Sequence, residues 1–312
     1  MPTSNAIKHA DYACIAVIPA DNILGENVLW HAKQQMIYWI DIEAALLQRY
    51  NLANQKIEKF SLPQRVGSFA FLASEANDKN NENQIIAAFA EGFAVYNFTS
   101  GNLRWLDRLL HAAPGLRFND GRVDRQGRFW AGSMVEDAQL AEQSGSLYCL
   151  QRGGKARAHL NNIAISNGLC WSPDGLTMYH ADSPTHQIFQ YDFCPLNGTL
   201  NNKRLFATAP DNAHPDGSIV DAQGCVWSAH WGAGKVVRYA PDGKILREVC
   251  MPVSQPSSVA IGGPNMDWLM VTSSKLGLNP QQAAQQPEAG HLFIYQLDES
   301  LGLSEQTCLL QV

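Results

Sequence analysis

Four oxygen-bearing side chains recur at one register along this chain of 312 residues. Each stands five positions ahead of the corresponding position in a strand, turn and strand pattern. The four are Glu26 before His31, Asn119 before Asp124, Asn167 before Ser172 and Asp216 before Asp221. Equivalent positions in repeated units occupy equivalent places in space, so units arranged radially would point all four side chains at one axis. Oxygen ligands that converge from several directions suit a hard metal ion.

The types of these side chains favour one divalent cation. Glu26 and Asp216 carry carboxylates, Asn119 and Asn167 carry carboxamides, and all four offer oxygen. Two carboxylates compensate the charge of such an ion, and oxygen ligands favour Ca²⁺, Mg²⁺ or Mn²⁺, with Zn²⁺ and Fe²⁺ kept as alternatives. Three or four protein ligands leave coordination positions for water and for a substrate oxygen, which is the arrangement of a catalytic Lewis acid.

Turns are the alternative explanation for these residues, because Asn-Gly and Pro-Asp-Gly are among the commonest turn sequences. Asp174 and Asp242 are assigned to turns on this ground. Asp216 differs, since a short strand follows it and runs into a separate turn at 221–224, which places Asp216 at the opposite end of the strand. Asn167 differs in the same way.

Short strands must position these side chains. Strand centres recur about every 40 to 50 residues, at Tyr38, Ala87, Trp130, Tyr179, Trp227 and Met270. Six centres predict one all-β domain over residues 1–312, a six-bladed β-propeller with four-stranded antiparallel blades around a central channel. The chain ends should share one blade, through strands at 14–19 and 291–297, because an open ring would expose sheet edges. We expect a hairpin loop at 75–82 and a surface connection at 275–290.

Composition excludes several classes of function. The chain is 46% hydrophobic and 17% charged, with a net charge of −6 and no long run of Lys or Arg, so we expect no nucleic-acid partner. The 7 cysteines are scattered and are expected to be free thiols. A signal peptide and an apolar run of about 18 residues are both missing from the sequence, which predicts a soluble, cytoplasmic protein without membrane partners. The tryptophans of the strand patterns should pack in the core.

Seven stretches match one family pattern in order: LGE at 24–26, RFNDGRVD at 117–124, FWAGSM at 129–134, SNGL at 166–169, PDG at 215–217, WGAGKVVRY at 231–239 and PEAG at 287–290. They resemble the senescence-marker-protein/gluconolactonase (SMP-30/gluconolactonase/LRE-like) family, whose members include regucalcin. The similarity covers nearly the whole chain. It implies a six-bladed propeller that binds one divalent cation at the mouth of its channel and hydrolyses sugar lactones.

The resemblance also implies roles for individual residues. These are metal ligation for Glu26, Asn167 and Asp216, and substrate contact for Arg117, Asn119 and Asp137. Asp216 would also act as general base or acid, taking a proton from water while the cation polarises the carbonyl of a gluconolactone or related aldonolactone. Register alone leaves Asn119 equally open as a metal ligand.

Two other functions compete with the sugar lactonase. A metal-dependent esterase or phosphotriesterase would use the same kind of cation on a different substrate, and a non-catalytic calcium-binding propeller would only bind the ion. His214 and His230 flank the Asp216 segment, and either could line the mouth of the channel. The sequence carries no indication of the oligomeric state.

Overall fold

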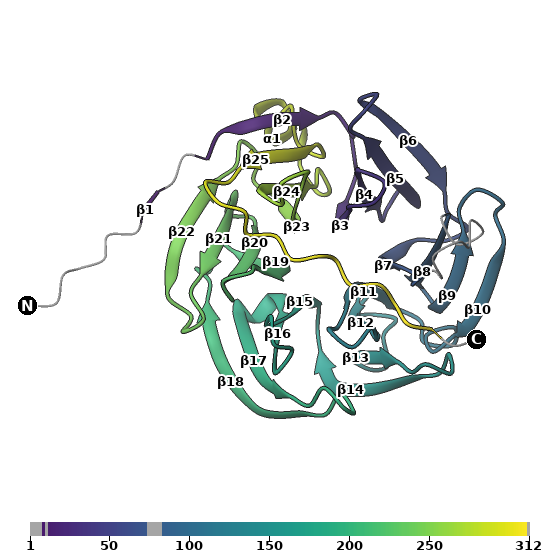
Figure 1. Ribbon diagram of the computed structural model, residues 1–312. Helices are drawn as coiled ribbons and strands as arrows, with labels where there is room; N and C mark the ends of the chain where they lie inside the picture. Colours follow the sequence, from purple (N-terminus) through teal and green to yellow (C-terminus); the bar gives the residue numbers. More distant parts are fainter. Residues whose placement is uncertain (1–7, 10–11, 74–82, 311–312) are drawn as a thin grey trace, which may run out of the picture.

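The repeats of the sequence fold into six antiparallel sheets arranged radially around one axis (Figure 1). The computed structural model describes the backbone of residues 8–9, 12–73 and 83–310. The chain is therefore a six-bladed β-propeller, which confirms the predicted fold class. Each predicted strand centre lies in the second strand of a blade. The hairpin loop predicted at 75–82 lies outside the described residues.

Each blade has four strands, named here from the innermost to the outermost. The first three blades are β3 (Gly25–His31), β4 (Met36–Asp41), β5 (Leu46–Asn51), β6 (Lys56–Ser61); β7 (Val66–Phe71), β8 (Gln84–Phe89), β9 (Gly92–Asn97), β10 (Leu103–Asp107); and β11 (Leu116–Val123), β12 (Phe129–Val135), β13 (Gly145–Leu150), β14 (Ala156–Ile163). The next two are β15 (Ser166–Trp171), β16 (Thr177–Asp182), β17 (Gln187–Phe193), β18 (Leu200–Thr208); and β19 (His214–Val220), β20 (Val226–Trp231), β21 (Lys235–Tyr239), β22 (Ile245–Cys250).

The sixth blade closes the ring by combining both ends of the chain. Its strands are β23 (Pro256–Gly262), β24 (Trp268–Ser273), β25 (Leu292–Gln296) and β2 (Cys14–Ile18). β2 pairs antiparallel with β25, which confirms the predicted closure. The connection at 275–290 contains the short helix α1 (Pro280–Gln285), a 3-10 turn (Ser183–Thr185) follows β16, and β1 (Lys8–His9) adds a parallel edge to the fifth blade.

Large apolar side chains fill the spaces between blades. Trp39, Trp130 and Trp227 are fully buried, as expected for core tryptophans. All 7 cysteines are free thiols, also as expected. Close packing near the axis depends on small residues, because a Cβ added at Gly67 would lie 2.5 Å from the carbonyl oxygen of Phe118.

Every innermost strand is irregular in its pairing with the second strand. The register shifts lie between Glu26 and Leu29, Val66 and Ser68, Phe118 and Gly121, Asn167 and Cys170, Pro215 and Ser218, and Pro256 and Val259. A bulge bends the strand and re-aims its side chains. The same irregularity thus recurs where the polar residues of the repeated register stand.

The hairpin end of the repeated register is structural. The buried carboxylate of Asp221 accepts hydrogen bonds from Nε1 of Trp227 at 2.9 Å and from Nε of Arg238 at 2.9 Å. Asp124 makes the corresponding bond to Nε1 of Trp130 at 2.8 Å in the third blade. These carboxylates hold the first hairpin of a blade against its core tryptophan.

The C-terminal segment crosses the end of the channel at which the innermost strands finish (Figure 1). The N–H of Ala222 donates to the carbonyl of Leu301 at 2.8 Å, and the N–H of Cys308 donates to the carbonyl of Phe71 at 2.8 Å. A small cavity of about 30 Å³ lies beneath this segment and is lined by Arg122 and Glu305, among others. This segment leaves the opposite end of the channel as the open mouth.

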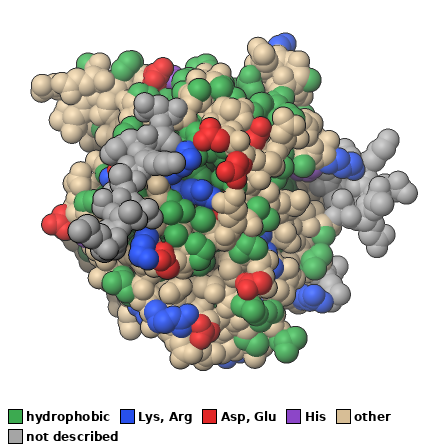
Figure 2. Space-filling model, turned by 60° about the vertical axis from the view of Figure 1, so that its left-hand side comes forward, with side chains coloured by type: hydrophobic (Ala, Val, Ile, Leu, Met, Phe, Trp, Pro, Cys, Tyr) green, Lys and Arg blue, Asp and Glu red, His purple; other side chains and the backbone are tan. Residues whose placement is uncertain are grey.

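Acidic and basic side chains are interspersed on the face presented in Figure 2, without one dominant patch of positive charge. Within the part of the chain that the structure describes, no helix has the length and apolar character to cross a membrane.

Replacing Asp221 by alanine should lower the free energy of unfolding by about 3–5 kcal/mol, because Arg238 and Trp227 would keep buried donors without their acceptor. Chemical denaturation followed by tryptophan fluorescence measures the change. Asp242→Ala is the control, since Asp242 pairs with Lys244 on the exposed surface and should leave the midpoint nearly unchanged. Equal midpoints for the two variants would contradict the structural role of Asp221.

Candidate metal centre

A cavity of about 290 Å³ opens where the innermost strands begin. Five of the six residues predicted for the site line it, namely Glu26, Arg117, Asn119, Asn167 and Asp216. The remaining lining residues are Leu24, Met134, Ile165, Ser183, Pro184, His214, Trp231 and Leu276. Polar groups from four blades therefore meet in one place, with apolar side chains around them.

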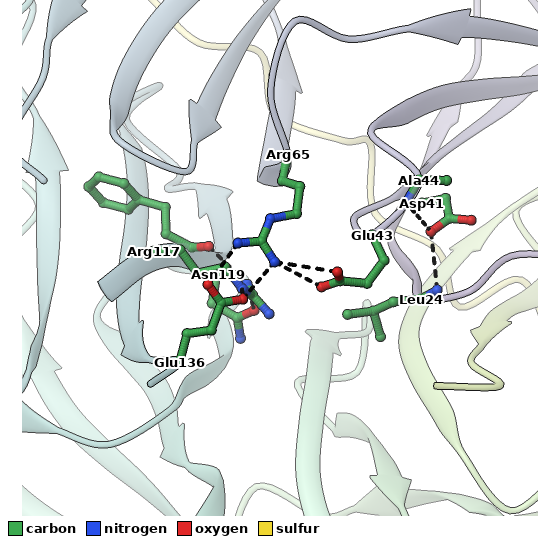
Figure 3. Close-up of polar contacts among 9 residues, drawn as sticks. Leu24, Asp41, Glu43, Ala44, Arg65, Arg117, Asn119 and Glu136 are labelled. Atoms are coloured by element: carbon green, nitrogen blue, oxygen red, sulfur yellow. Dashed lines mark hydrogen bonds and ion pairs between the residues drawn. The ribbon is translucent and has the colours of Figure 1, made fainter. Parts of the chain in front are cut away.

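Two acidic residues hold the backbone segments that lead into two of the innermost strands. Asp41, at the end of β4, accepts hydrogen bonds from the N–H groups of Ile23 at 2.8 Å and Leu24 at 3.1 Å, and Figure 3 shows the second of these. Asp182, at the end of β16, accepts from the N–H of Ile165 at 2.9 Å in the same manner. Each carboxylate holds the backbone just ahead of an innermost strand. The positions of Glu26 and Asn167 along the channel axis are fixed as a result.

The two carboxamides are oriented by a chain of hydrogen bonds. Nη1 of Arg117 donates to Oδ1 of Asn119 at 2.8 Å, and Nδ2 of Asn119 donates to Oδ1 of Asn167 at 3.0 Å. Nδ2 of Asn167 then donates to Oγ of Ser183 at 2.8 Å, and that hydroxyl donates to the carbonyl of Pro215 at 2.7 Å. Because arginine can only donate, the oxygen of Asn119 must face Arg117. Asn167 keeps a second lone pair on Oδ1 for another partner.

Burial of several acidic groups dominates the electrostatics of the site. Burial, together with the neighbouring Asp120, raises the pKa of Glu26 to about 8. Burial and the carboxylate of Glu26 likewise hold the pKa of Asp216 well above its ordinary value. Burial also raises the pKa of Asp120, whose Oδ2 accepts a hydrogen bond from the N–H of Leu169 at 3.0 Å. Arg117 and Arg122 offset these shifts only in part, and none of the three carboxyl groups forms an ion pair with a described residue.

The donor set fits a hard divalent cation. Glu26, Asp216 and the oxygen of Asn167 provide two carboxylates and an amide, and the raised pKa values indicate negative charge that a cation would stabilise. Among the described residues, no three His, Cys, Asp or Glu side chains are grouped closely enough to hold a metal by themselves. An ion bound here would therefore depend on the amide of Asn167 as well as on the acids.

The guanidinium of Arg117 lines the cavity and uses only part of its hydrogen-bonding capacity within the protein. The side chain is buried, and its Nε donates to Oε1 of Glu136 at 3.1 Å. Nη1 donates to the carbonyl of Phe118 and to Asn119, whereas Nη2 makes no hydrogen bond with a described residue. Nη2 of Arg117 is therefore able to donate hydrogen bonds to an oxygen-rich ligand.

Asp137 lies apart from the other predicted site residues. Its Oδ1 accepts a hydrogen bond from the N–H of Gln139 at 2.8 Å in an exposed turn, and it does not line the cavity. The neighbouring Glu136 contacts Arg117 instead. Of the two flanking histidines, His214 lines the cavity, whereas His230 is buried within the fifth blade and pairs with the hydroxyl of Tyr239 at 3.1 Å.

Sequence reasoning missed three polar groups of the site: Asp120, Glu136 and Ser183. Asp120 follows Asn119 directly, and a bulge at that position lets two neighbouring side chains approach one place, which is a signal that the repeat itself offers. The roles of Glu136 and Ser183 depend on contacts that no repeat spacing encodes.

Similarities to known proteins extend over most of this chain. The model of the SMP-30/gluconolactonase/LRE-like region matches residues 24–275. An L-arabinolactonase of Azospirillum brasilense is 36% identical over 88% of this chain and 89% of the relative, and a 6-deoxy-6-sulfogluconolactonase of Pseudomonas putida is 33% identical over 89% and 92%. The crystal structure of a calcium-binding protein, regucalcin, from Agrobacterium tumefaciens superposes with a TM-score of 0.85 at 26% identity, covering 95% of this chain and 97% of that one.

The cation-free protein should become less stable as the pH rises from about 5 to about 8. The pKa of Glu26 is higher in the folded than in the unfolded state, so its contribution is present below the unfolded pKa and is lost as the pH passes the folded pKa of about 8. Thermal melting of chelator-treated wild type and Glu26→Gln across this range measures the effect. The difference between the two melting temperatures should shift in favour of the variant as the pH rises, and a constant difference would contradict the burial of an uncompensated carboxylate.

Proposed function

Because the chain belongs to the SMP-30/gluconolactonase/LRE-like family, we propose that it is a sugar lactonase that hydrolyses an uncharged aldonolactone with the help of one divalent cation. The observation that carries the proposal is the shared cavity of Glu26, Asn167, Asp216, Arg117 and Asn119, in a chain with two lactonases among its relatives. Ca²⁺, Mg²⁺, Mn²⁺, Zn²⁺ and Fe²⁺ are the candidate ions.

Glu26, Asn167 and Asp216 would hold the cation, which when bound supplies Lewis-acid polarisation of a carbonyl. Asn119 is assigned to the substrate side, because its oxygen faces Arg117 and its nitrogen orients the oxygen of Asn167. In this assignment Asn119 contacts the substrate and also holds the amide of the metal ligand Asn167 in place.

Asp216 is the proposed general base. Its raised pKa makes its carboxylate a better proton acceptor than an exposed aspartate. The oxygen of a water molecule bonds to the lactone carbonyl carbon while Asp216 takes the proton of that water. The ring carbon–oxygen bond then breaks, and the proton returns to the ring oxygen to give the hydroxyl group of the aldonic acid.

The charge of the cavity favours an uncharged substrate. Among the described lining residues Arg117 is the one arginine or lysine, and Glu136 already pairs with it. A sulfonate or phosphate on the sugar would meet no further fixed cation and would face the nearby acids. The Pseudomonas putida relative acts on a sulfonated lactone, whereas we assign this chain to uncharged lactones such as that of the Azospirillum brasilense relative.

A metal-dependent esterase is the second candidate. Part of the cavity lining is apolar, with Leu24, Met134, Ile165, Trp231 and Leu276 among its residues, and it would accept an uncharged aliphatic or aryl ester. Arg117 and Asn119, which also line the cavity, favour the polyhydroxylated lactone.

A pH-indicator assay on metal-stripped protein, with single ions restored, tests the proposed function. We expect metal-dependent turnover of uncharged pentono- and hexonolactones, and rates at least about tenfold lower with a 6-sulfonated lactone, because a buried unpaired charge disfavours binding. Turnover restricted to simple esters would support the second candidate. An absence of turnover with any lactone under any ion would remove the lactonase proposal.

Replacing Asp216 by asparagine should lower kcat by about 10²–10⁴-fold, since an amide cannot accept the proton from water. Much of the cation affinity should remain, because the amide oxygen can still ligate the ion. Asp174→Asn is the matched control, as Asp174 forms an exposed turn in which its Oδ1 accepts from the N–H of Leu176 at 3.0 Å. A rate for Asp216→Asn equal to that of this control would reject Asp216 as the base.

A further inference from the structure

Charged side chains from three blades meet beside Arg117, as Figure 3 shows. Arg65 stands immediately before β7, Glu43 lies in the turn after β4, and Glu136 follows β12. Nη1 and Nη2 of Arg65 bind both carboxylate oxygens of Glu136, at 2.6 and 2.7 Å. Nη1 also donates to Oε1 of Glu43 at 3.2 Å. Arg65 therefore ties the first, second and third blades together beside the site.

Glu136 links this cluster to the cavity. Its Oε1, which accepts from Arg65, also accepts from Nε of Arg117 at 3.1 Å. Asn119 and the carbonyl of Phe118 hold Nη1 of Arg117 from the other side. Glu136 and Asn119 thus fix the guanidinium at two of its three nitrogens, and Nη2 is left for a ligand.

We propose that Arg65 is a positioning residue of the lactone site, which holds Glu136 in the orientation that leaves Nη2 of Arg117 open to substrate. The inference rests on the proposed function. It assigns a role to a residue that does not line the cavity and acts only through Glu136.

The geometry explains why Arg65 is needed. Arginine and carboxylate groups prefer a two-pronged pair, in which both oxygens accept from one guanidinium. Arg65 takes this two-pronged pairing with Glu136, so Oε2 of Glu136 is not available to Arg117. Without Arg65, Glu136 would be free to rotate and to bind both Nε and Nη2 of Arg117. The carboxylate would then compete with the substrate for Nη2.

The charges of the cluster point the same way. Burial acts to raise the pKa of Glu136, but the ion pairs with Arg65 and Arg117 outweigh it and hold the pKa below its ordinary value. Arg65 and Arg117 balance Glu43 and Glu136, so these four groups together carry no net charge. Loss of Arg65 would leave one more carboxylate than guanidinium in this cluster, beside Arg117.

Steady-state kinetics of Arg65→Ala provide the first test. We expect KM for the preferred lactone to rise roughly 5- to 20-fold with kcat changed less than about twofold, as for loss of one charge-assisted contact to bound substrate. Arg65→Lys should restore part of the affinity, because an ammonium keeps the charge without the two-pronged geometry. In Arg65→Ala combined with Glu136→Gln, KM should not rise further than in Glu136→Gln alone, since the competing carboxylate is gone.

Arg108→Ala is the matched control. Arg108 pairs with Glu91 on the second blade at exposures of 38% and 30%, close to the 33% and 34% of Arg65 and Glu136. Among the described residues its side chain contacts Glu91, His111 and Trp105, none of which lines the cavity, so the variant should leave KM unchanged. If KM of Arg65→Ala matched that of Arg108→Ala, the positioning role would be wrong.

A second readout does not depend on turnover. The Nε–H resonance of Arg117 in a nuclear magnetic resonance spectrum should shift in Arg65→Ala and stay in place in Arg108→Ala, because only the first variant frees Glu136. An unshifted resonance would overturn the inference even if the enzyme is active. If the wild type hydrolyses no lactone but the resonance of Arg117 shifts in Arg65→Ala, the proposed function is rejected, whereas the contact between Arg65, Glu136 and Arg117 is supported.

Discussion

Like charge buried at one mouth of a closed ring is the constraint on which this structure depends. Glu26, Asp216 and Asp120 come from three blades, and burial keeps the pKa of each above its ordinary value, with repulsion from neighbouring carboxylates adding to the effect at Glu26 and Asp216. An uncompensated buried carboxylate is unfavourable, so the fold must either keep these groups protonated or provide a cation. Three buried acidic groups are therefore expected of a cation-binding site, and would destabilise the fold if they had only a structural role.

The propeller holds these groups together by features that recur around the ring. Bulges re-aim side chains in every innermost strand, and Asp41 and Asp182 fix the backbone ahead of two of them. β2 pairs with β25, so both ends of the chain are held in one sheet and the ring is closed. The ion pairs of Arg65 add to this, because they join three blades beside Arg117.

Much of this architecture follows from the sequence, because a propeller repeats one unit. The spacing of the second strands predicted six blades, and the shared register predicted that Glu26, Asn167 and Asp216 would meet. Repeat spacing cannot predict which of two adjacent acids reaches a neighbour. Glu136 contacts Arg117, while Asp137, one position later, turns to the N–H of Gln139. Whether Asp137 also contacts substrate stays a prediction. Contacts between blades, such as those of Arg65, are set by tertiary packing and leave no periodic signal.

Anomalous diffraction from crystals grown with Mn²⁺ tests the central claim most directly, because the scattering locates the ion without reference to activity. The account predicts one strong peak per chain in the cavity, within bonding distance of the carboxylates of Glu26 and Asp216 and of Oδ1 of Asn167. A peak elsewhere in the molecule, or an ion in the cavity that none of these three side chains touches, would contradict it.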